Sequence, residues 1–361
     1  MPLHWNKTCK FNSFRIILVL VLLSLTACSA SETTSPGATS TPVSLETSSP
    51  VMTSTPRPTS TPTLPPLGKE GNPITIGFIL TPEQTAAIEA AEDVAFRIKD
   101  STGYTIESRI YPDFQSLSSA VLDDEVDLFW LEPLEYIYLK NMDAAQAILM
   151  TNHLGVYEYG VQFLANKDSG FQVYYDSETN QNTTNSSSVL QQFAGTRPCF
   201  INAESIPGYF LPMSLLAEAS TPTLDPVFTY DYSAAIRALY IQGICDFGVT
   251  YTMTGDPFTA SEILRDLPDA QEQVIVIWRS EGIIPNLNLS ASPALPLDIR
   301  YKLEEAILNI SKDPNGLILL NSSLEYDVGA LKSIRDQIYD PLRNLLYLLE
   351  LDLKEITGAA S

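Results

Sequence analysis

The apolar positions of this chain begin with one short continuous run near the N-terminus. Residues 16–25 are almost entirely apolar and follow the basic side chains of Lys7, Lys10 and Arg15. The run is shorter than the roughly 18 apolar residues that a membrane-spanning helix needs. With the small residues that precede Cys28, it indicates an export signal that is removed from the mature protein.

A polar tract follows this run and separates it from the rest of the chain. Residues 29–67 contain few large apolar side chains and are rich in Ser, Thr and Pro. Such a segment buries too little apolar surface to offset the entropy lost on ordering. We therefore expect a disordered spacer, stiffened locally by its prolines.

Beyond the spacer, short apolar runs alternate with amphipathic segments. Thr81, Pro82 and Gln84 form a helix-start signal that resembles a capping box. The pattern predicts strands at residues 74–80, 104–111 and 126–131, and helices at residues 82–101, 114–122 and from Pro133 onward. Strands that alternate with helices of this length indicate parallel βαβ units.

The same pattern starts again in the second half of the chain. It predicts strands at residues 196–201, 227–230, 245–249 and 273–278, and helices at residues 208–217, 233–242, 297–310 and 336–356. Residues 180–188 are a polar insertion for which we predict a surface loop or a disordered tip. Two βαβ sets predict an α/β protein with two lobes of similar build.

The predicted division of the chain follows from these patterns. Residues 1–27 are the signal, residues 28–71 the spacer, residues 72–160 with 275–361 the first lobe, and residues 161–274 the second lobe. The folded part is long enough to bury a sizeable core.

The charge balance limits the classes of partner. The formal net charge is −22, and nucleic-acid binding requires basic patches to neutralise phosphates. A nucleic-acid partner is therefore excluded, and docking on an anionic lipid surface is disfavoured. Most of these charges serve solubility.

Two cysteines remain in the predicted folded part, Cys199 and Cys245, and each enters a predicted strand. An exported protein can oxidise such a pair if neighbouring strands bring the two side chains together. Two buried thiols are the alternative, and we favour it.

The residues needed for common enzyme mechanisms are missing from the sequence. There is no Gly-x-Ser-x-Gly motif, and His153 is the one histidine that remains after signal removal. Asp123 and Asp124 belong to an acidic turn rather than to a glycosidase pair. No nucleotide-binding loop and no metal-ligand spacing occurs. We expect a protein that is not an enzyme and holds no metal or cofactor.

The residues around the predicted cleavage site resemble the lipobox of bacterial lipoproteins, Leu25-Thr26-Ala27-Cys28. The resemblance implies cleavage before Cys28 and a diacylglyceryl group on its sulfur. One acyl chain anchors a protein only marginally, so stable attachment requires more than one chain. An ordinary secretory signal with a nearby cysteine is the alternative. We expect the lipid-anchored form, held at the extracytoplasmic face of a cell membrane.

Four segments resemble the substrate-binding proteins of phosphate-, phosphite- and phosphonate-type ABC transporters. They are Val-Asp-Leu-Phe-Trp-Leu-Glu-Pro-Leu-Glu-Tyr at residues 126–136, residues 198–212 with Gly208-Tyr209, residues 234–249, and Ile284-Pro285-Asn286. The resemblance implies a type II periplasmic-binding-protein fold, in which each lobe has a mostly parallel sheet flanked by helices. It also implies a cleft between the lobes that closes on a small solute, a monomeric chain, and a separate ABC permease as partner.

The family's cleft lies at the ends of strands, where helix N-termini suit oxyanions. We expect apolar and cation–π surfaces from Trp130, Tyr136, Tyr209 and Tyr232. Ser205, Ser233 and Thr250 supply hydroxyl groups there, although each of them is as well suited to capping a helix. Further candidate ligand-binding residues are Thr81, Phe114, Glu132 and Gly208.

The sequence departs from the family pattern at the turns that hold the anion. The family's Ser-Thr-Ser turn reads Ser205-Ile206-Pro207, its His before the next helix is Tyr232, and the Gly before Pro133 is Glu132. Proline also removes a backbone donor.

Acidic side chains gather near these turns: Glu83, Glu132, Glu135, Glu204 and Asp231. Carboxylates in one cleft repel an oxyanion and favour a cation. We therefore predict an amine-bearing or neutral polar ligand in place of phosphate, with phosphonate doubtful. The alternative is that these carboxylates face solvent.

Two other roles are compatible with the same fold and tether. A sensory protein presents its bound solute to a membrane receptor or kinase instead of a permease. A lobe pair that has lost its ligand serves as an adhesion or scaffold protein. Thermal-shift screening and the identity of the neighbouring genes would separate these roles from transport.

Overall fold

The computed structural model describes residues 64–252, 267–349 and 351–359. All of them belong to one compact unit, Pro62–Ser361. The predicted signal, Cys28 and nearly all of the predicted spacer lie outside the described residues. Among the residues described, no helix combines the length and the apolar character that crossing a membrane requires.

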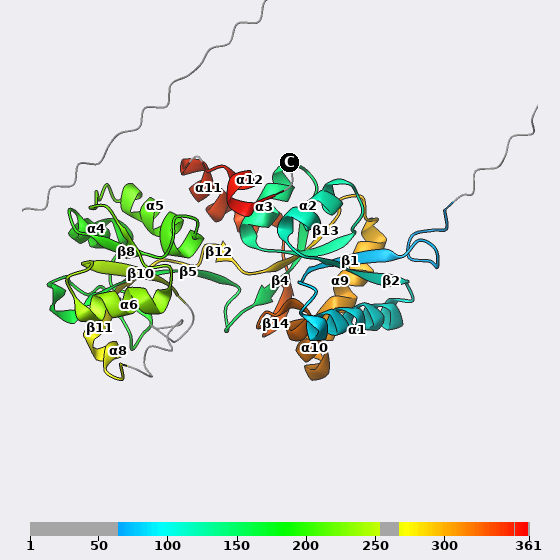
Figure 1. Ribbon diagram of the computed structural model, residues 1–361, viewed down its shortest axis with the longest axis horizontal. Helices are drawn as coiled ribbons and strands as arrows, with labels where there is room; N and C mark the ends of the chain where they lie inside the picture. The colour runs from blue at the N-terminus through cyan, green and yellow to red at the C-terminus, as the bar shows by residue number, and fades with distance from the viewer. Residues whose placement is uncertain (1–63, 253–266, 350, 360–361) are drawn as a thin grey trace, which may run out of the picture. The chain divides into compact units, whose positions relative to one another are not determined.

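The first sheet has six strands in the order β14-β4-β13-β3-β1-β2. Their bounds are β1 Ile74–Ile79, β2 Ile106–Tyr111, β3 Leu128–Leu131, β4 Gln146–Asn152, β13 Asn288–Ala291 and β14 Ala330–Ser333. Helices α1 (Thr85–Thr102), α9 (Leu297–Lys312) and α10 (Pro314–Leu324) lie on one face, and α2 (Phe114–Leu122) and α3 (Pro133–Asn141) lie on the other (Figure 1).

Strand β3 shows why the sheet is covered on both faces. All four of its residues are buried. Leu128 and Trp130 pack in the core with α1 and α9, whereas Phe129 and Leu131 pack in the core with α2 and α3. Successive side chains of a strand point to opposite faces, so a strand buried on both faces reads as a continuous apolar run.

The second sheet has the order β11-β5-β10-β8-β9, and β12 pairs with the start of β5. The strands are β5 Glu158–Asn166, β8 Pro198–Phe200, β9 Val227–Phe228, β10 Phe247–Thr252, β11 Val274–Arg279 and β12 Ile284–Pro285. The associated helices are α4 Ser186–Leu190, α5 Leu211–Glu218, α6 Tyr232–Ile241 and α8 Ala270–Gln273. Short helical turns are η1 Lys167–Ser169, η2 Gln191–Phe193 and the π-helix η3 Ile206–Phe210.

Both sheets are mixed, and in each of them most strands run in one direction. Strands β1, β2, β3 and β4 share one direction, and β13 and β14 run against them. In the second sheet β5 runs against its neighbours β10 and β11. The chain enters the second sheet on β5 and returns to the first sheet on β13. The direction of such strands depends on how the chain crosses between sheets, which hydrophobic periodicity does not show.

Three local predictions need correction. Residues 64–71, predicted as spacer, are ordered: Gly68 N–H donates to the Asn72 carbonyl at 2.8 Å, and Leu67 packs on the core. The insertion at residues 180–188 contains strand β7 (Gln181–Asn182), paired with β6 (Tyr175–Asp176), instead of a plain loop. Strand β11 belongs to the second sheet, although the predicted boundary placed its residues from 275 in the first lobe.

The predicted single helix at residues 336–356 is three separate pieces: η4 Asp336–Tyr339, α11 Asp340–Leu348 and α12 Leu353–Thr357. Pro341 lies in the first turn of α11, where its fixed φ and missing N–H are tolerated. Asp352 caps α12 by accepting from the Lys354 N–H at 2.9 Å. Pro341 and Asp352 thus each mark the start of a new helix. The amphipathic periodicity continues across these starts, so it predicted one helix.

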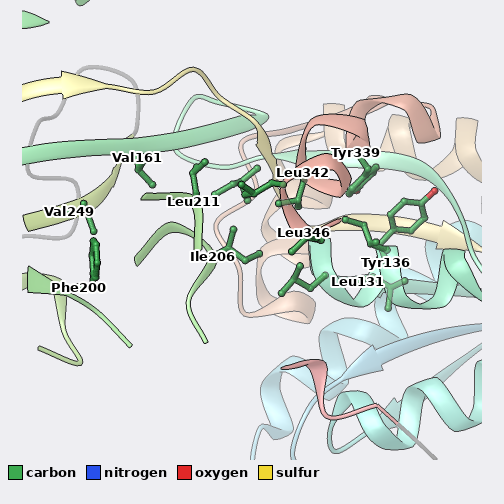
Figure 2. Close-up of a cluster of buried hydrophobic side chains, with 14 of the residues drawn as sticks. Leu131, Tyr136, Val161, Phe200, Ile206, Leu211, Val249, Tyr339, Leu342 and Leu346 are labelled. Carbon is green, nitrogen blue, oxygen red and sulfur yellow. The ribbon is translucent and has the colours of Figure 1, made fainter. Parts of the chain in front are cut away.

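One buried cluster joins elements of both sheets (Figure 2). Val161, Phe200 and Val249 of the second sheet belong to the same cluster as Leu131 and Tyr136. Between them lie Ile206 and Leu211, with Leu342 and Leu346 of α11. The C-terminal helices therefore complete the core instead of forming an appendage.

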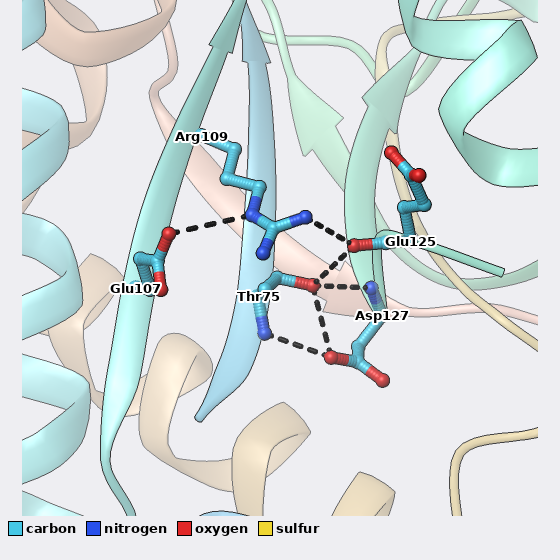
Figure 3. Close-up of polar contacts among 5 residues, drawn as sticks. All are labelled: Thr75, Glu107, Arg109, Glu125 and Asp127. Atoms are coloured by element: carbon cyan, nitrogen blue, oxygen red, sulfur yellow. Dashed lines mark hydrogen bonds and ion pairs between the residues drawn. The ribbon is translucent and has the colours of Figure 1, made fainter. Parts of the chain in front are cut away.

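A polar clamp fixes the start of β3 against β1 (Figure 3). The Asp127 carboxylate accepts from both the N–H and the hydroxyl of Thr75, at 2.8 and 2.9 Å, and the Thr75 hydroxyl oxygen lies 2.9 Å from the Asp127 N–H. Nearby, Arg109 donates to the Glu125 carbonyl at 2.8 Å. Because these contacts set the register of β3, they also determine where the residue after Leu131 lies.

Cys199 and Cys245 form a disulfide, so the favoured prediction of two buried thiols is wrong. Strands β8 and β10 pair in parallel with Cys199 opposite Gly248, and Cys245 enters β10 beside it. The two Cα atoms are 5.6 Å apart, within the usual range for a disulfide. The sequence could not reveal the bond because it depends on β8 and β10 being neighbours.

We predict that this disulfide makes a measurable contribution to stability. It spans a sequence separation of 46 residues, and closing a loop of that length corresponds to about 3 to 4 kcal/mol in the chain-entropy description. Thermal melts with and without dithiothreitol measure the effect. The melting temperature of the wild type should fall on reduction, whereas that of a Cys199→Ala/Cys245→Ala variant should not respond to the reductant. Equal melting temperatures for reduced and oxidised wild type would contradict a structural role.

Candidate ligand-binding site

A cavity of about 290 Å³ is lined from both sheets. Glu132, His153, Asn286 and Tyr326 come from segments that flank the first sheet. Tyr159, Pro207, Tyr232 and Tyr251 come from elements of the second sheet. The cavity therefore lies between the two sheets, where the sequence predicted a ligand cleft.

The first sheet brings its four residues together through strand pairing. Glu132 directly follows β3, whose last residue, Leu131, lies opposite Asn288 of β13. Asn286 precedes β13, and His153 follows β4, the strand on the other side of β13. Tyr326 precedes β14, which pairs with β4 in turn. Segments far apart in sequence thus meet at one edge of the sheet.

The tyrosines of the second sheet form a connected aromatic wall. The ring of Tyr251 on β10 lies 4.8 Å from that of Tyr232 and 6.3 Å from that of Tyr159, both edge-to-face. Tyr232 is the first residue of α6, and Tyr159 lies near the start of β5. Edge-to-face contacts hold such rings in place and leave ring faces available to a ligand.

Glu132 is the acidic group of the cavity. Its side chain is exposed to the cavity, but the surrounding walls displace bulk water, and this desolvation raises the pKa of the carboxyl to about 7. The pKa of the neighbouring Glu135 is also raised to about 7, mainly by desolvation, against the lowering effect of its hydrogen bond from the Glu132 N–H at 2.8 Å. No Lys or Arg occurs among the described residues that line the cavity.

The phenols around Glu132 stay neutral at physiological pH. Desolvation is the main cause that raises the pKa of Tyr159, Tyr232 and Tyr326. The negative charge of Glu132 adds to the raised pKa of Tyr159 and Tyr326. These rings therefore offer neutral, electron-rich faces near a carboxylate.

Asn286 and His153 are oriented by bonds to the backbone. Asn286 is 2% exposed, and its Nδ2 donates to the Val156 carbonyl at 2.8 Å, while its buried Oδ1 has no hydrogen-bond partner. His153 Nδ1 donates to the Asp327 carbonyl at 2.8 Å, and its ring lies 4.4 Å from that of Tyr326. A carbonyl oxygen only accepts, so the proton of the histidine is on Nδ1.

Some of the backbone donors that would bind an oxyanion at the helix starts beside the cavity are already used or absent. Pro133 and Pro207 occupy the first turns of α3 and η3 and have no N–H. Ser205 accepts from the Gly208 N–H at 3.0 Å, and Asp231 accepts from the Ala234 N–H at 2.9 Å. The cavity thus presents a carboxylate and tyrosine faces, which suit a cation.

Two of the predicted site residues, Glu132 and Tyr232, line the cavity. Tyr136 does not face it: the side chain is fully buried, its hydroxyl donates to Asp336 at 2.5 Å, and its ring lies 4.3 Å from that of Tyr339. Trp130 is 3% exposed in the core of the first sheet. Phe114 is also core, edge-on to Tyr138. These three apolar side chains are held by packing on the sheet faces.

The remaining predicted residues have structural partners outside the cavity lining. Ser205 caps η3, Thr250 accepts from Gln162 at 2.8 Å, and Tyr209 packs against Phe200 and Phe228. A Cβ on Gly208 would lie 2.6 Å from Ile201, so that glycine permits close packing. Thr81 is exposed, and its N–H donates to Gln84 Oε1, which is half of the predicted capping box. Ser233 is half-buried in the first turn of α6.

Sequence reasoning missed Tyr159, Tyr251, Tyr326 and His153 as cavity residues. Tyr159 and Tyr251 lie on β5 and β10, which pair antiparallel, and a local pattern does not show that pairing. His153 directly follows β4, and Tyr326 lies a few residues before β14. Positions at strand ends are typical of ligand-binding residues in α/β proteins. That positional signal was available for His153, which follows a buried strand.

We predict that Glu132 makes the protein less stable as pH rises through the range between its ordinary and its raised pKa. The folded state keeps the proton up to about pH 7, whereas the unfolded state loses it near the ordinary carboxyl value of about 4.5, so the unfolded state binds fewer protons in this window and stability falls. Urea unfolding at several pH values tests this. Glu132→Gln should be more stable than wild type at pH 8 and equal to it at pH 4.

The pKa of Glu135 is also raised to about 7, mainly by desolvation and in part by Glu132, so the difference between the two curves reports Glu132 together with its effect on Glu135. Glu204→Gln is the matched control, because Glu204 is exposed and lies outside the cavity lining. A Glu132→Gln variant that is less stable than wild type at pH 8 would contradict the desolvated carboxylate.

Comparison with known proteins agrees with this architecture. Residues 76–339 match the family model described as ABC transporter, phosphonate, periplasmic substrate-binding protein. No curated protein matches the chain.

Solved structures with the same fold include XAC2383 from Xanthomonas citri, determined with chloride and with ATP. Its sequence is 16% identical to this chain. The alignment covers 78% of this chain and 97–98% of XAC2383, with a TM-score of 0.53. PhnD1 from Prochlorococcus marinus, in complex with methylphosphonate, is 14% identical over 77% of this chain and 98% of its own, with a TM-score of 0.49.

At these identities the structural likeness shows the fold alone: two lobes with mixed sheets flanked by helices, as in type II periplasmic binding proteins. The family model covers most of the chain and gives the assignment. The chain belongs to the family of periplasmic, non-enzymatic substrate-binding proteins of phosphonate-type ABC transporters.

Proposed function

We propose that this substrate-binding protein carries a small solute with a protonated amine, and that Glu132 holds the charged nitrogen. The observation that supports the proposal most strongly is the cavity lining, with one desolvated carboxylate, four tyrosines and no Lys or Arg among its described residues. A cation over tyrosine faces gains about 0.5–2 kcal/mol, more when it is desolvated.

The electrostatic balance favours a cation over the family's anionic solutes. A phosphonate needs donors to replace its hydration shell, and the N–H groups of Gly208 and Ala234 are bonded to Ser205 and Asp231. An anion would also approach the Glu132 carboxylate and raise its already elevated pKa further. PhnD1 was determined with methylphosphonate, and this chain is proposed to differ from it in ligand charge.

A protonated amine, in contrast, relieves an unfavourable feature of the cavity, the desolvated carboxyl of Glu132. It lowers the pKa of Glu132 and replaces the water that the ionised carboxylate lost. Asn286, whose buried amide oxygen lacks a partner, lies in the same cavity wall. The same lining would admit a neutral polar solute, and pH dependence separates the two classes.

We predict that amine binding strengthens as pH rises from 6 to 8, because Glu132, with a pKa of about 7, must be ionised to attract the cation. Isothermal titration with 1,4-diaminobutane, tetramethylammonium, 2-aminoethylphosphonate, methylphosphonate and inorganic phosphate measures this. Glu132→Gln should weaken binding of the amines about 10- to 100-fold, in line with the loss of one partner of a desolvated charge pair, and should remove the pH dependence.

Glu204→Gln is the control and should bind like wild type. A solute bound equally well at pH 6 and 8, and unaffected by Glu132→Gln, would indicate a neutral ligand. Methylphosphonate or phosphate binding at submicromolar Kd, with no amine bound, would contradict the proposal.

We further propose that the protein is tethered to the extracytoplasmic face of the membrane by lipid on Cys28. The support is the sequence around the cysteine, Leu25-Thr26-Ala27-Cys28, and the Ser/Thr/Pro-rich tract after it. A tether raises the local concentration of the binding protein at its permease, so that modest affinity for the permease suffices.

The expected result of replacing Cys28 by Ala is release of the protein from membranes to the soluble extracytoplasmic fraction. Metabolic labelling with an alkyne-tagged palmitate analogue, followed by fractionation, measures it. Cys9→Ala is the matched control, because Cys9 lies in the predicted signal, and it should leave labelling and location unchanged. Labelling that survives Cys28→Ala would refute this anchor.

A further inference from the structure

A second cavity, of about 520 Å³, lies at the opposite end of the first sheet from the ligand cavity. Its lining comes from the start of β4, the first half of α9 and the segment after β14. Its polar lining residues are Gln146, Arg300, Glu304, Ser333, Arg335, Asp336 and Gln337. Its volume falls in the range of about 300–1,000 Å³ that is typical of small-molecule sites.

The strand register separates the two cavities. Along β13, Asn288 lies opposite Leu131 and Met150, next to the ligand cavity. Ala291, at the other end of β13, lies opposite Gln146, which lines the second cavity. No residue lines both cavities, so the second cavity is a distinct location.

Arg300 is the unusual group of the second cavity. It is 8% exposed, and its guanidinium lies 5.5 Å from the ring centroid of Tyr301. One Nη donates to the neutral side-chain oxygen of Gln146, and Nε is buried with no hydrogen-bond partner. A buried guanidinium is costly unless an acceptor, and preferably a negative charge, satisfies it.

The acidic residues of the cavity do not satisfy Arg300, because they bond elsewhere. Glu304 accepts from the Ser333 hydroxyl at 2.5 Å. Asp336 pairs with Arg343 and accepts from the Tyr136 hydroxyl. In the described part of the chain neither Arg300 nor Arg335 takes part in an ion pair. Two guanidinium groups thus line one cavity in a protein of net charge −22.

We propose that this second cavity binds a small carboxylate, with Arg300 and Arg335 as its charge partners. The planar fork of a guanidinium matches the two oxygens of a carboxylate. A carboxylate is favoured over a phosphate dianion, because Glu304 and Asp336 line the same cavity and repel a second negative charge. A bound carboxylate supplies the acceptor that the buried Nε of Arg300 lacks.

The proposal is tested by titrating the full-length protein with acetate, propionate and inorganic phosphate, monitored by saturation-transfer NMR and calorimetry. Acetate or propionate should bind with a Kd below about 1 mM, and phosphate should bind at least tenfold more weakly. Arg335→Gln, at an exposed position, should preserve the melting temperature and weaken carboxylate binding at least tenfold.

Matched variants complete the design. Lys302→Gln removes an exposed cation from the same helix, outside the cavity lining, and should leave carboxylate binding unchanged. Arg300→Lys keeps the charge, loses the fork and should weaken binding, with its fold checked by its melting curve.

Glu132→Gln should not affect carboxylate binding, which separates this cavity from the amine site. Carboxylate binding that is absent in wild type, or that survives Arg335→Gln and is lost in Glu132→Gln, would overturn the proposal.

Discussion

A carboxylate set among tyrosine rings, with no Lys or Arg among the described residues of the cavity wall, is the constraint on which the site depends. Desolvation of Glu132 raises the pKa of its carboxyl to about 7, so the cavity holds an acid that is only partly ionised near neutral pH. A ligand that brings positive charge gains from this arrangement twice, through direct attraction and through relief of the desolvated charge. A ligand that brings negative charge loses on both counts.

The position of Glu132 follows from backbone contacts well away from the cavity. The Thr75–Asp127 clamp at the start of β3 and the pairing of β3 with β13 determine where the strand ends. Pro133 then starts α3 at once, so Glu132 occupies the turn between strand and helix. In the family pattern a glycine occupies the position of Glu132, and hydroxyl residues occupy the positions of Ile206 and Pro207. Together these differences replace hydrogen-bond donors and a flexible glycine with a carboxylate and apolar side chains.

Local signals in the sequence predicted strands β1, β2, β3, β8, β9, β10 and β11, most of the helices and two residues of the cavity, but they missed β4, β5, β13 and β14. Glu132 and Tyr232 could be found because each lies at a strand-to-helix turn, where a short pattern is enough. Tyr251 and Tyr326 could not, since their place depends on which strands are neighbours. The same reason hid the Cys199–Cys245 disulfide and the reversed strands. Tyr136 shows the opposite error: a helix start suggested the cavity, but packing against Tyr339 and a bond to Asp336 hold it in the core.

The charge of the natural solute is measured by mass spectrometry of small molecules released from the full-length protein, purified from its native host without refolding. The cavity chemistry predicts a released compound with a protonated amine, at a near-stoichiometric ratio to wild-type protein and strongly reduced in Glu132→Gln. A phosphonate or phosphate without an amine, released equally from both proteins, would contradict the role assigned to Glu132.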